Sequence, residues 1–364
     1  MEQTQAAHRF AQVTFPSLTG WEDDDHLAAL KALHDSAPAL EKSHDPFAKQ
    51  LADLIGRSDF SSITNAAAAR NFFEQNFTPH RIVTDEKSGL LTGYYEPEIK
   101  ASYDPEPGFK VPVLARPDDL INLMEEADRG AKAGQMTHAR QLPGGEIEPY
   151  PTRREIEEGA LADRGLELMY VADPVDLFFM QVQGSGLARM TDGTAVRLIY
   201  AGKNGHNYTS IGRYLIDSGQ FPSEDMTLQA LIAWLKADPE RARPVMWKND
   251  SYIFFRVLGP EDQTRTLGTN DIPLTPLRSL AVDTAYYPLG LPIFISVPEL
   301  KHAVENGETG FHRLMVAHDV GSAIRGPERG DLYYGSGIAA GEKAGPTKHA
   351  CNFFALLPNP PSRS

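Results

Sequence analysis

The sequence predicts a mainly β protein in which helices come first and a barrel-like β region comes last. Apolar runs typical of strands recur after residue 245, at 252–257, 279–282, 293–297 and 314–318. A short pattern, Ala-x-Asp-x6-Gly, begins at Ala281 and again at Ala317, and each copy follows one of these strands. Two similar strand–Asp–turn units favour a barrel of two interlocked halves. Coincidence is the alternative, because only three positions match.

The first hundred residues are predicted to be helical before they turn to strand. Asp45-Pro46 is a favourable helix start, and apolar residues follow it at helical spacing. A second helix is predicted over 66–77 and a strand over 90–97. From about 104 to 150 the chain is rich in proline and poor in apolar runs, which indicates strands and loops at the entry to a second domain.

Helix signals return after residue 150. Thr152 and Glu155 fit a capping box, which predicts a short helix. Residues 209–218 have a helical pattern that ends at Gly219. The apolar spacing from Leu228 onward predicts an amphipathic helix that ends near Asp238-Pro239.

Length, charge and cysteine content exclude several classes of protein. A chain of 364 residues favours two or three domains with a full core of their own. The 49 Asp and Glu residues exceed the 35 Lys and Arg residues, so the formal charge is −14. This balance argues against binding to nucleic acid or to anionic lipid. The single cysteine, Cys351, excludes an intrachain disulfide, a four-cysteine zinc site and an iron–sulfur cluster.

The sequence carries no membrane or export signal. It has no run of 18 apolar residues, and its first ten residues, MEQTQAAHRF, have neither a basic region nor an apolar one. We therefore expect no transmembrane segment. Either the protein is cytosolic or an export signal has been removed, and the sequence does not choose between the two.

Two acidic residues flank a glycine-rich segment at 319–345. This segment lacks the spacing of a phosphate-binding loop, so nucleotide binding is not predicted. Asp319 and Asp331 lie at predicted turns beside apolar strands. A carboxylate beside apolar surface loses hydration, which raises its pKa toward the value that a general acid for glycosidic bonds needs. The alternative is that both side chains cap turns by accepting backbone N–H bonds.

A second group of polar residues occurs at 176–212. Gln181 and Gln183 alternate with apolar residues, which predicts a strand with an amide face along a groove. Amide side chains suit sugar hydroxyls because they both donate and accept hydrogen bonds. Lys203 and Asn204 lie at a turn signal from which they could reach a ligand. The alternative is an ordinary polar hairpin.

Tyrosine pairs are further ligand candidates, whereas metal-ligand patterns are absent. The pairs lie at 94–95, 286–287 and 333–334, and a tyrosine offers a sugar both a flat ring and a hydroxyl. The eleven histidines form no HExxH motif and no cluster at ligand spacing. We therefore predict no metal and no cofactor.

Several long motifs, in order, resemble those of the membrane-bound lytic murein transglycosylase A family with its C-terminal three-aspartate domain. The motifs are LTGYYEP (91–97), FFMQVQGSG (178–186), YAGKNGHNYTSIGRYLID (200–217), LAVDTAYYPLGLP (280–292) and LMVAHDVGSAIRGPERGDLYYGSG (314–337). The resemblance covers about residues 85–350. The three aspartates of the domain name fall on Asp283, Asp319 and Asp331.

The resemblance implies a specific architecture. A discontinuous domain, 1–103 and 245–364, would contain a double-psi β-barrel with the three-aspartate region at 275–350. A smaller β-domain, 104–244, would be inserted, and a glycan strand would lie in a groove between the two. The residues expected to bind this substrate are Thr92, Tyr94, Tyr95, Gln183, Ser185, Lys203 and Asn204.

The resemblance also implies an activity. Family members cleave the β-1,4 bond between N-acetylmuramic acid and N-acetylglucosamine in peptidoglycan without water. Asp331 would act first as general acid and then as base, and the product would carry a 1,6-anhydro ring. Asp319 would position or tune Asp331, and Asp283 would be structural. The alternatives are an inverting glycoside hydrolase that uses Asp331 and Asp319, and a non-catalytic peptidoglycan-binding module.

The resemblance finally implies a setting for the enzyme. We expect peptidoglycan glycan strands and other cell-wall enzymes as partners, a monomer, and a location in the periplasm or at the outer membrane. Two departures from the family pattern matter. The segment between Asp319 and Asp331 is slightly longer, so the loop that leads to Asp331 can differ in position. The chain also shows no N-terminal lipid-bearing cysteine, so membrane attachment does not transfer.

Overall fold

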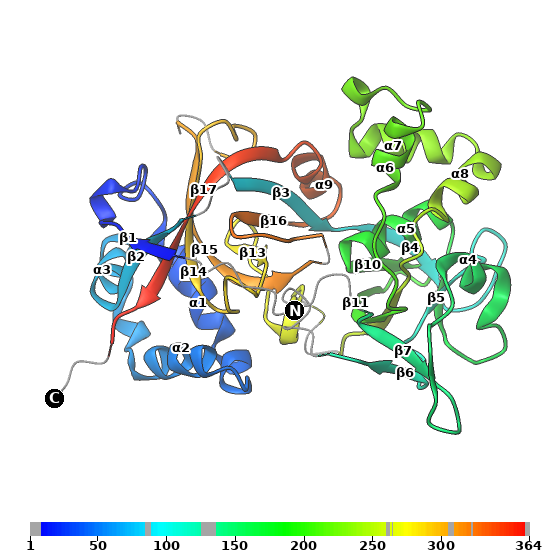
Figure 1. Cartoon of the computed structure of the whole chain (residues 1–364), viewed down its shortest axis with the longest axis horizontal. Coiled ribbons are helices and arrows are strands. Elements are labelled where there is room, and N and C mark those ends of the chain that lie inside the picture. Colours follow the sequence, from blue (N-terminus) through cyan, green and yellow to red (C-terminus); the bar gives the residue numbers. More distant parts are fainter. Residues whose placement is uncertain are drawn as a thin grey trace, which may run out of the picture. The chain divides into compact units, whose positions relative to one another are not determined.

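The chain forms two compact units (Figure 1). The computed structural model describes residues 9–83, 89–124, 136–259, 263, 265–304, 309–321 and 323–360. Unit 1 comprises 1–93, 267–335 and 347–364, and unit 2 comprises 94–266 and 336–346, so the units are comparable in length. Unit 2 includes more of the sequence than the predicted insert of 104–244. The reason is that β4 (Glu98–Ser102) and β12 (Ile253–Val257) pair into its sheet.

Six strands of unit 1 close into a barrel. Their order is β3-β17-β14-β15-β13-β16, with β16 paired back to β3. The strands are β3 (Gly89–Glu96), β13 (Ser279–Val282), β14 (Pro292–Val297), β15 (Phe311–Val320), β16 (Arg329–Ser336) and β17 (Lys348–Pro358). β2 (Phe77–Val83) and β1 (Arg9–Gln12) extend the sheet beyond β17. The mainly β class with a barrel is therefore confirmed, as are the strands predicted at 279–282, 293–297 and 314–318.

The repeated Ala-x-Asp-x6-Gly pattern corresponds to two interlocked halves of this barrel. Its two strands, β13 and β15, lie side by side and run parallel. Each glycine bonds to the other half, because Gly290 N donates to Ala317 O at 2.7 Å and Gly326 N donates to Asp283 Oδ2 at 2.8 Å. Both glycines have positive φ (86° and 111°), a conformation that favours glycine.

Three helices cover one side of the barrel in unit 1 (Figure 1). They are α1 (His26–Glu41), α2 (Pro46–Arg57) and α3 (Ala66–Asn76), with the one-turn helices η1 (Phe15–Ser17), η2 (Phe60–Ser62) and η6 (Thr269–Asp271) elsewhere in the unit. Asp25, Asp45 and Asn65 accept backbone N–H bonds at the three helix starts. The helices predicted at Pro46 and over 66–77 are thus confirmed. Their apolar faces pack against buried residues of β14 and β15, Phe294 and Leu314 among them.

Unit 2 contains a six-stranded sheet in the order β12-β11-β10-β4-β9-β5. The strands not yet given are β5 (Val111–Leu114), β9 (Glu167–Val171), β10 (Ser185–Met190) and β11 (Ala195–Lys203). A smaller sheet is formed by β6 (Leu120–Asn122), β7 (His138–Gln141) and β8 (Ile147–Glu148). The segment predicted to hold strands and loops therefore contains short strands in both sheets.

Three helices of unit 2 pack their buried residues against α5 (Pro174–Gln183). They are α6 (Ile211–Asp217), α7 (Leu228–Lys236) and α8 (Pro239–Met246). The unit also contains α4 (Arg153–Glu155), the π-helix η4 (Ile156–Ala160), η5 (Ser223–Asp225) and α9 (Ile338–Ala344). The capping box of Thr152 and Glu155 and the helices predicted near 209–218 and from 228 are confirmed. None of the helices in the described ranges is long and apolar enough to span a bilayer.

One prediction of local structure is wrong, because Gln181 and Gln183 lie on helix α5 and not on a strand. Asp173 accepts the Val175 N–H bond, Pro174 occupies the first turn, and Gly184 ends the helix with φ of 85°. These end signals outweigh the short polar–apolar alternation. On a helix, residues two apart point in different directions, so the two amides do not share one face.

Candidate active site

Four strands of unit 1 align the candidate catalytic residues in one row. Asp331 lies within β16 and Asp319 near the end of β15, so neither is at a turn as predicted. Ala281 of β13 pairs with Asp331 on one side and with Asp319 on the other. Paired residues project to the same face of a sheet. Both aspartates therefore face the same side of the barrel, with only the small side chain of Ala281 between them.

Thr92 extends this row from the next strand, β3. Its hydroxyl donates a hydrogen bond of 2.5 Å to Asp331 Oδ1. Burial of the Asp331 carboxyl raises its pKa to about 6, and the negative charge of Asp319 also raises it. The Thr92 hydrogen bond and the positive charge of Arg329 lower it, but less strongly than burial raises it. Asp331 therefore exchanges its proton near neutral pH, as one residue that acts as both acid and base requires.

Asp319 is held in a fixed orientation. Its Oδ1 atom accepts hydrogen bonds from Thr269 N at 3.1 Å, Thr269 Oγ1 at 2.9 Å and Val320 N at 2.9 Å. These bonds fix the position of the Asp319 carboxylate beside Asp331, and its charge raises the pKa of Asp331. Two of them come from backbone N–H groups, as in the alternative interpretation.

Asp283 has a structural environment. Its carboxylate is buried and accepts bonds from Ala285 N at 3.1 Å and Gly326 N at 2.8 Å. These bonds tie its own turn to the equivalent turn of the other barrel half. The side chain therefore holds the turn that precedes β16, in agreement with the structural role expected for it.

The remaining candidate residues lie in unit 2, apart from Thr92. Gln183 Oε1 accepts a hydrogen bond of 3.1 Å from Tyr95 N, so the structure brings these two together. Tyr94 and Ser185 are buried, with Ser185 at the start of β10. Lys203 is buried at the end of β11.

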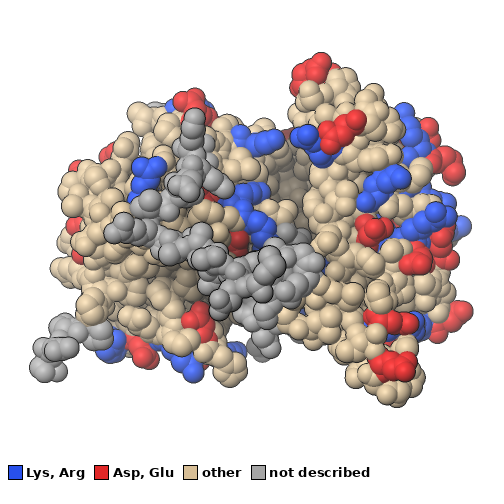
Figure 2. Space-filling view, viewed as in Figure 1, with Lys and Arg blue, Asp and Glu red and all other residues tan. Residues whose placement is uncertain are grey.

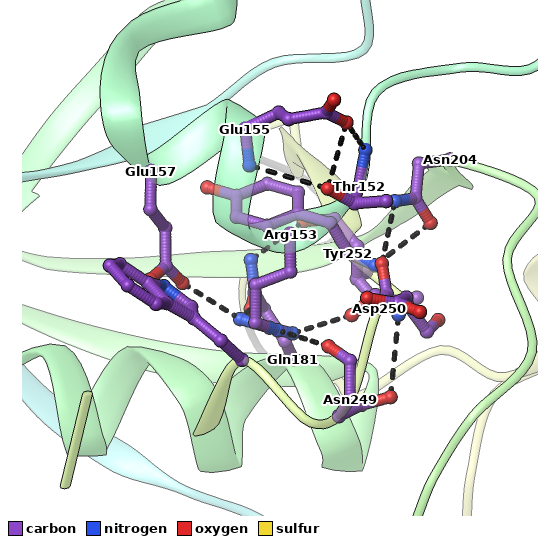
Figure 3. Close-up of polar contacts among 12 residues, drawn as sticks. Thr152, Arg153, Glu155, Glu157, Gln181, Asn204, Asn249, Asp250 and Tyr252 are labelled. Carbon is purple, nitrogen blue, oxygen red and sulfur yellow. Dashed lines mark hydrogen bonds and ion pairs between the residues drawn. The ribbon is translucent and has the colours of Figure 1, made fainter. Parts of the chain in front are cut away.

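Asn204 bonds to the main chain at both ends of its amide (Figure 3). Its Nδ2 donates to Pro151 O at 2.9 Å and to Asp250 O at 2.8 Å, and its Oδ1 accepts from Tyr252 N at 2.9 Å. The side chain is 1% exposed. Asn204 therefore fixes the loop around it, and its amide is not directed at a ligand.

Arg153 is the centre of the same network and was not singled out from the sequence. Its guanidinium, stacked over the rings of Phe178 and Tyr252, donates to main-chain oxygens of Asn249 and Ser251. It also donates to Gln181 Oε1 at 2.6 Å and Glu157 Oε1 at 3.1 Å (Figure 3). Gln181 is thus part of the scaffold. The one sequence signal was the neighbouring capping box, which places Arg153 at the first turn of a helix.

Arg329 and Lys348 are two further residues that the sequence analysis missed. Arg329 lies two residues before Asp331 on β16, and Lys348 of β17 pairs directly with Thr92 of β3. The side chains of Arg329 and Lys348 therefore project from the same barrel face as that of Asp331. The spacing of Arg329 and Asp331 is visible in the sequence once 329–336 is known to be a strand. The position of Lys348 depends on strand register.

The described ranges contain no group of three or more His, Cys, Asp or Glu residues arranged to hold a metal ion. The candidate site has two carboxylates, Asp331 and Asp319, and the Thr92 hydroxyl in one row on a barrel face. A pair of carboxylates in different environments is the set of residue types that acid–base enzymes of the glycosidase class use.

Comparisons with known proteins identify the family. Residues 90–256 match the model of the MltA specific insert domain, and residues 278–357 match the 3D domain. The membrane-bound lytic murein transglycosylase A of Vibrio cholerae is 35% identical over 280 residues, 76% of this chain and 67% of that protein. Its counterpart in Escherichia coli K12 is 35% identical over 74% of this chain and 66% of that protein. This chain thus spans about two thirds of the length of these relatives.

Solved structures agree over nearly the whole chain. A membrane-bound lytic murein transglycosylase from Agrobacterium tumefaciens has a TM-score of 0.84 at 35% identity, covering 96% of this chain and 97% of that one. MltA from Neisseria gonorrhoeae has a TM-score of 0.75 at 29% identity, covering 97% and 92%. Escherichia coli MltA with bound chitohexaose has a TM-score of 0.69 at 27% identity, covering 96% and 95%. The chain belongs to the membrane-bound lytic murein transglycosylase A family, which implies a peptidoglycan-cleaving enzyme with a double-psi β-barrel.

Proposed function

We propose that this protein is a lytic transglycosylase that cleaves the β-1,4 bond between N-acetylmuramic acid and N-acetylglucosamine and leaves a 1,6-anhydro end. The observation that carries the proposal is the environment of Asp331. Its carboxyl is packed on the barrel, has a pKa raised to about 6, and accepts a bond from Thr92. Such a group is protonated in part of the population and ionised in the rest at neutral pH, so it can both give and take a proton.

In the proposed reaction, Asp331 gives up a proton in the first step and takes one back in the second. Protonated Asp331 donates to the glycosidic oxygen while the bond from that oxygen to C1 of the muramoyl ring breaks, which leaves an oxocarbenium-like ring. Ionised Asp331 then takes the proton of that ring's C6 hydroxyl as its oxygen bonds to C1. No water is consumed, and Asp331 ends protonated. Because the nucleophile belongs to the same sugar, proximity lowers the barrier.

Asp319 and Thr92 assist Asp331 in this proposal. Asp319, held by Thr269 and by Val320 N, supplies a fixed negative charge that disfavours ionisation of Asp331 and stabilises a cationic sugar ring. Thr92 orients the Asp331 carboxyl and stabilises its ionised form in the second step.

The row geometry also supports one competing reaction. β15 and β16 are separated by a single strand, β13, so the backbones that carry Asp319 and Asp331 are about 10 Å apart. Inverting glycosidases place their two carboxyls about 6.5–9.5 Å apart to admit a water molecule. An inverting hydrolase with Asp331 as acid and Asp319 as base is therefore the second candidate, and a non-catalytic binding module is the third.

Digestion of purified sacculi separates these candidates. The released muropeptides are weighed by mass spectrometry. A transglycosylase releases anhydro products, which are lighter by one water than the products of a hydrolase, and a binding module releases nothing. Hydrated products alone, or no products, contradict the proposal.

Substitution of the two aspartates assigns their roles. We expect Asp331→Asn to reduce release about 10²–10⁴-fold, because the amide cannot supply a proton. Asp319→Asn should reduce it less. Asp53→Asn, which changes an exposed carboxylate on α2, is the matched control and should leave release unchanged. Full release by Asp331→Asn would refute the assignment of the catalytic acid.

The substrate-binding residues and the setting are part of the same proposal. We infer that Thr92, Tyr94, Tyr95, Gln183, Ser185 and Lys203 contact the glycan strand. The chitohexaose bound to the Escherichia coli relative supports a glycan ligand. The names of the relatives support a periplasmic or outer-membrane location. We propose that the protein acts there as a monomer, with other cell-wall enzymes as its partners.

A further inference from the structure

Two cations lie close to Asp331 on the same barrel face. Lys348 pairs with Thr92, whose hydroxyl bonds to Asp331, and Arg329 precedes Asp331 by two residues on β16. The row on this face therefore runs from Lys348 through Thr92, Asp331 and Ala281 to Asp319. Figure 2 shows a group of Lys and Arg atoms over the strands that Figure 1 labels β13 and β16.

Neither cation forms an ion pair with a carboxylate among the residues that the structure describes. Within the described part of the chain, the Lys348 ammonium makes no hydrogen bond or ion pair, and its side chain is exposed. Arg329 is half-buried, and its hydrogen bonds to described residues go to the main-chain oxygens of Leu90, at 3.5 Å, and Gly330. It is close enough to Asp331 to lower its pKa, yet it forms no ion pair with it among the described residues.

Other basic residues of this protein contrast with these two. Many arginines contact a carboxylate within 4.0 Å: Arg140, Arg153, Arg154, Arg164, Arg189, Arg197, Arg213 and Arg278. The chain has 14 more acids than bases, so acidic partners are plentiful. Two cations without such partners, beside the proposed catalytic acid, are available for a negatively charged ligand.

We propose that Arg329 and Lys348 form an anion subsite that binds a carboxylate on the substituent of the muramoyl sugar. This inference rests on the proposed function, which places that sugar at Asp331. Lys348 lies two strands from Asp331, about 10 Å in backbone spacing, and its long side chain can span part of that distance. The subsite thus lies within reach of a substituent on the sugar whose C1 faces Asp331.

The charge of the row also sets the direction of the glycan strand. Lys348 and Arg329 attract a carboxylate, whereas the fixed charge of Asp319 at the other end repels it. A glycan strand bound across the row from Lys348 to Asp319 therefore has its carboxylate-bearing substituent near β17 and away from β15. Peptidoglycan offers this carboxylate from two sources, the lactyl group itself once the stem peptide is removed, or the stem peptide while it is attached.

Binding measurements with three kinds of strand distinguish these sources. The Asp331→Asn variant prevents turnover, and its Kd is measured by calorimetry for native peptide-bearing strands, for amidase-stripped strands, and for stripped strands whose lactyl carboxylate has been converted to an amide. We expect at least one charged strand to bind about tenfold more tightly than the neutral one. Tight binding of the stripped strand identifies the lactyl carboxylate, and tight binding of the native strand alone identifies the stem. Equal Kd values for all three strands would overturn the proposal.

Substitutions localise the effect. Added to Asp331→Asn, Lys348→Gln and Arg329→Gln should each reduce the preference for the charged strand several-fold, whereas Lys348→Arg should keep it. Lys49→Gln on α2 removes an exposed charge elsewhere in unit 1 and is the matched control. A preference that survives Lys348→Gln and Arg329→Gln together would also overturn the proposal. Failure of the proposed function shows instead as absence of anhydro products from the unsubstituted enzyme.

Discussion

Arg153 in unit 2 and Asp331 in unit 1 are both charged groups withdrawn from water, but their surroundings differ. Arg153 is 1% exposed and donates to four acceptors, two of them main-chain oxygens. For Asp331, within the described residues, the Thr92 hydroxyl is the one hydrogen-bond donor. A buried charge with all its partners is locked in one state, whereas a withdrawn charge with few partners keeps two protonation states accessible.

This comparison distinguishes a charge that holds the structure together, Arg153, from a charge that we propose to be catalytic, Asp331. The hydrogen bonds of Arg153 tie α4 to α5 and to the 249–252 segment, so its charge is part of the packing of unit 2. Burial of Asp331 raises its pKa to about 6, which makes its charged form costly in the folded protein at neutral pH. The fold tolerates that cost at the residue that we propose as the catalytic acid.

The largest expected effect comes from removal of the Arg153 charge. Arg153→Met leaves the oxygens of Gln181, Asn249 and Ser251 without their donor in a buried site. We expect the free energy of unfolding to fall by about 3–5 kcal/mol, because each buried acceptor that loses its donor costs about 1–3 kcal/mol. Urea denaturation followed by circular dichroism measures this change.

The neighbouring arginine provides the control. Arg154 pairs with Glu158 at 3.1 Å, and both side chains are about half exposed, at 60% and 47%. Arg154→Met should cost less than about 1 kcal/mol, because exposed i,i+4 pairs contribute little. Similar losses for the two substitutions would contradict the scaffold role of Arg153.

Asp331→Asn should instead stabilise the protein at neutral pH. The folded pKa of about 6 lies above the ordinary value of 3.8. Between these values the folded state binds more protons than the unfolded state, so the stability of the unsubstituted protein falls as pH rises through that window. The amide cannot ionise, so the variant should be more stable by about 1–3 kcal/mol at pH 7.5 and equally stable at pH 3.5.

Thermal or urea unfolding at the two pH values tests this expectation. The upper value, about 3 kcal/mol, applies to a fully buried carboxyl. Asp331 is partly exposed, which lowers the expected gain in stability. Asp53→Asn on α2 is again the control, and it should give no gain that depends on pH. A gain of equal size at both pH values would point to packing and not to the ionisation of Asp331.

Local signals in the sequence predicted much of this fold. Proline and the capping residue Asp45 fixed the start of α2, the Thr152–Glu155 capping box fixed that of α4, and apolar runs marked β13, β14 and β15. Each of these elements depends on residues that are neighbours in sequence. The same analysis was wrong for α5, where a short alternating pattern competed with stronger helix-end signals at Asp173 and Gly184.

The site itself required information that a sequence alone does not contain. The row from Lys348 to Asp319 depends on the register of five strands that are far apart in the chain. Asn204 and Gln181 have amide side chains of the kind that bind sugars. In the structure, however, Asn204 bonds to buried main chain and Gln181 bonds to Arg153. Whether a polar side chain faces a ligand or the scaffold is decided by these distant partners.

The smallest expected effect is a shift in the pH profile of kcat/KM when Thr92 is replaced. It tests directly whether Asp331 keeps two accessible protonation states. Thr92 donates to the Asp331 carboxylate and so stabilises its charged form. Thr92→Val removes that bond, which raises the pKa of Asp331. In the proposed reaction Asp331 has to be protonated at the start, so activity is expected to fall as pH rises through this pKa. We therefore expect the alkaline limb of the profile of kcat/KM to move upward by as much as about one pH unit. Thr92→Ser keeps the hydroxyl and should keep the limb in place. A limb that stays fixed or moves downward in Thr92→Val would show that the titrating acid is not Asp331.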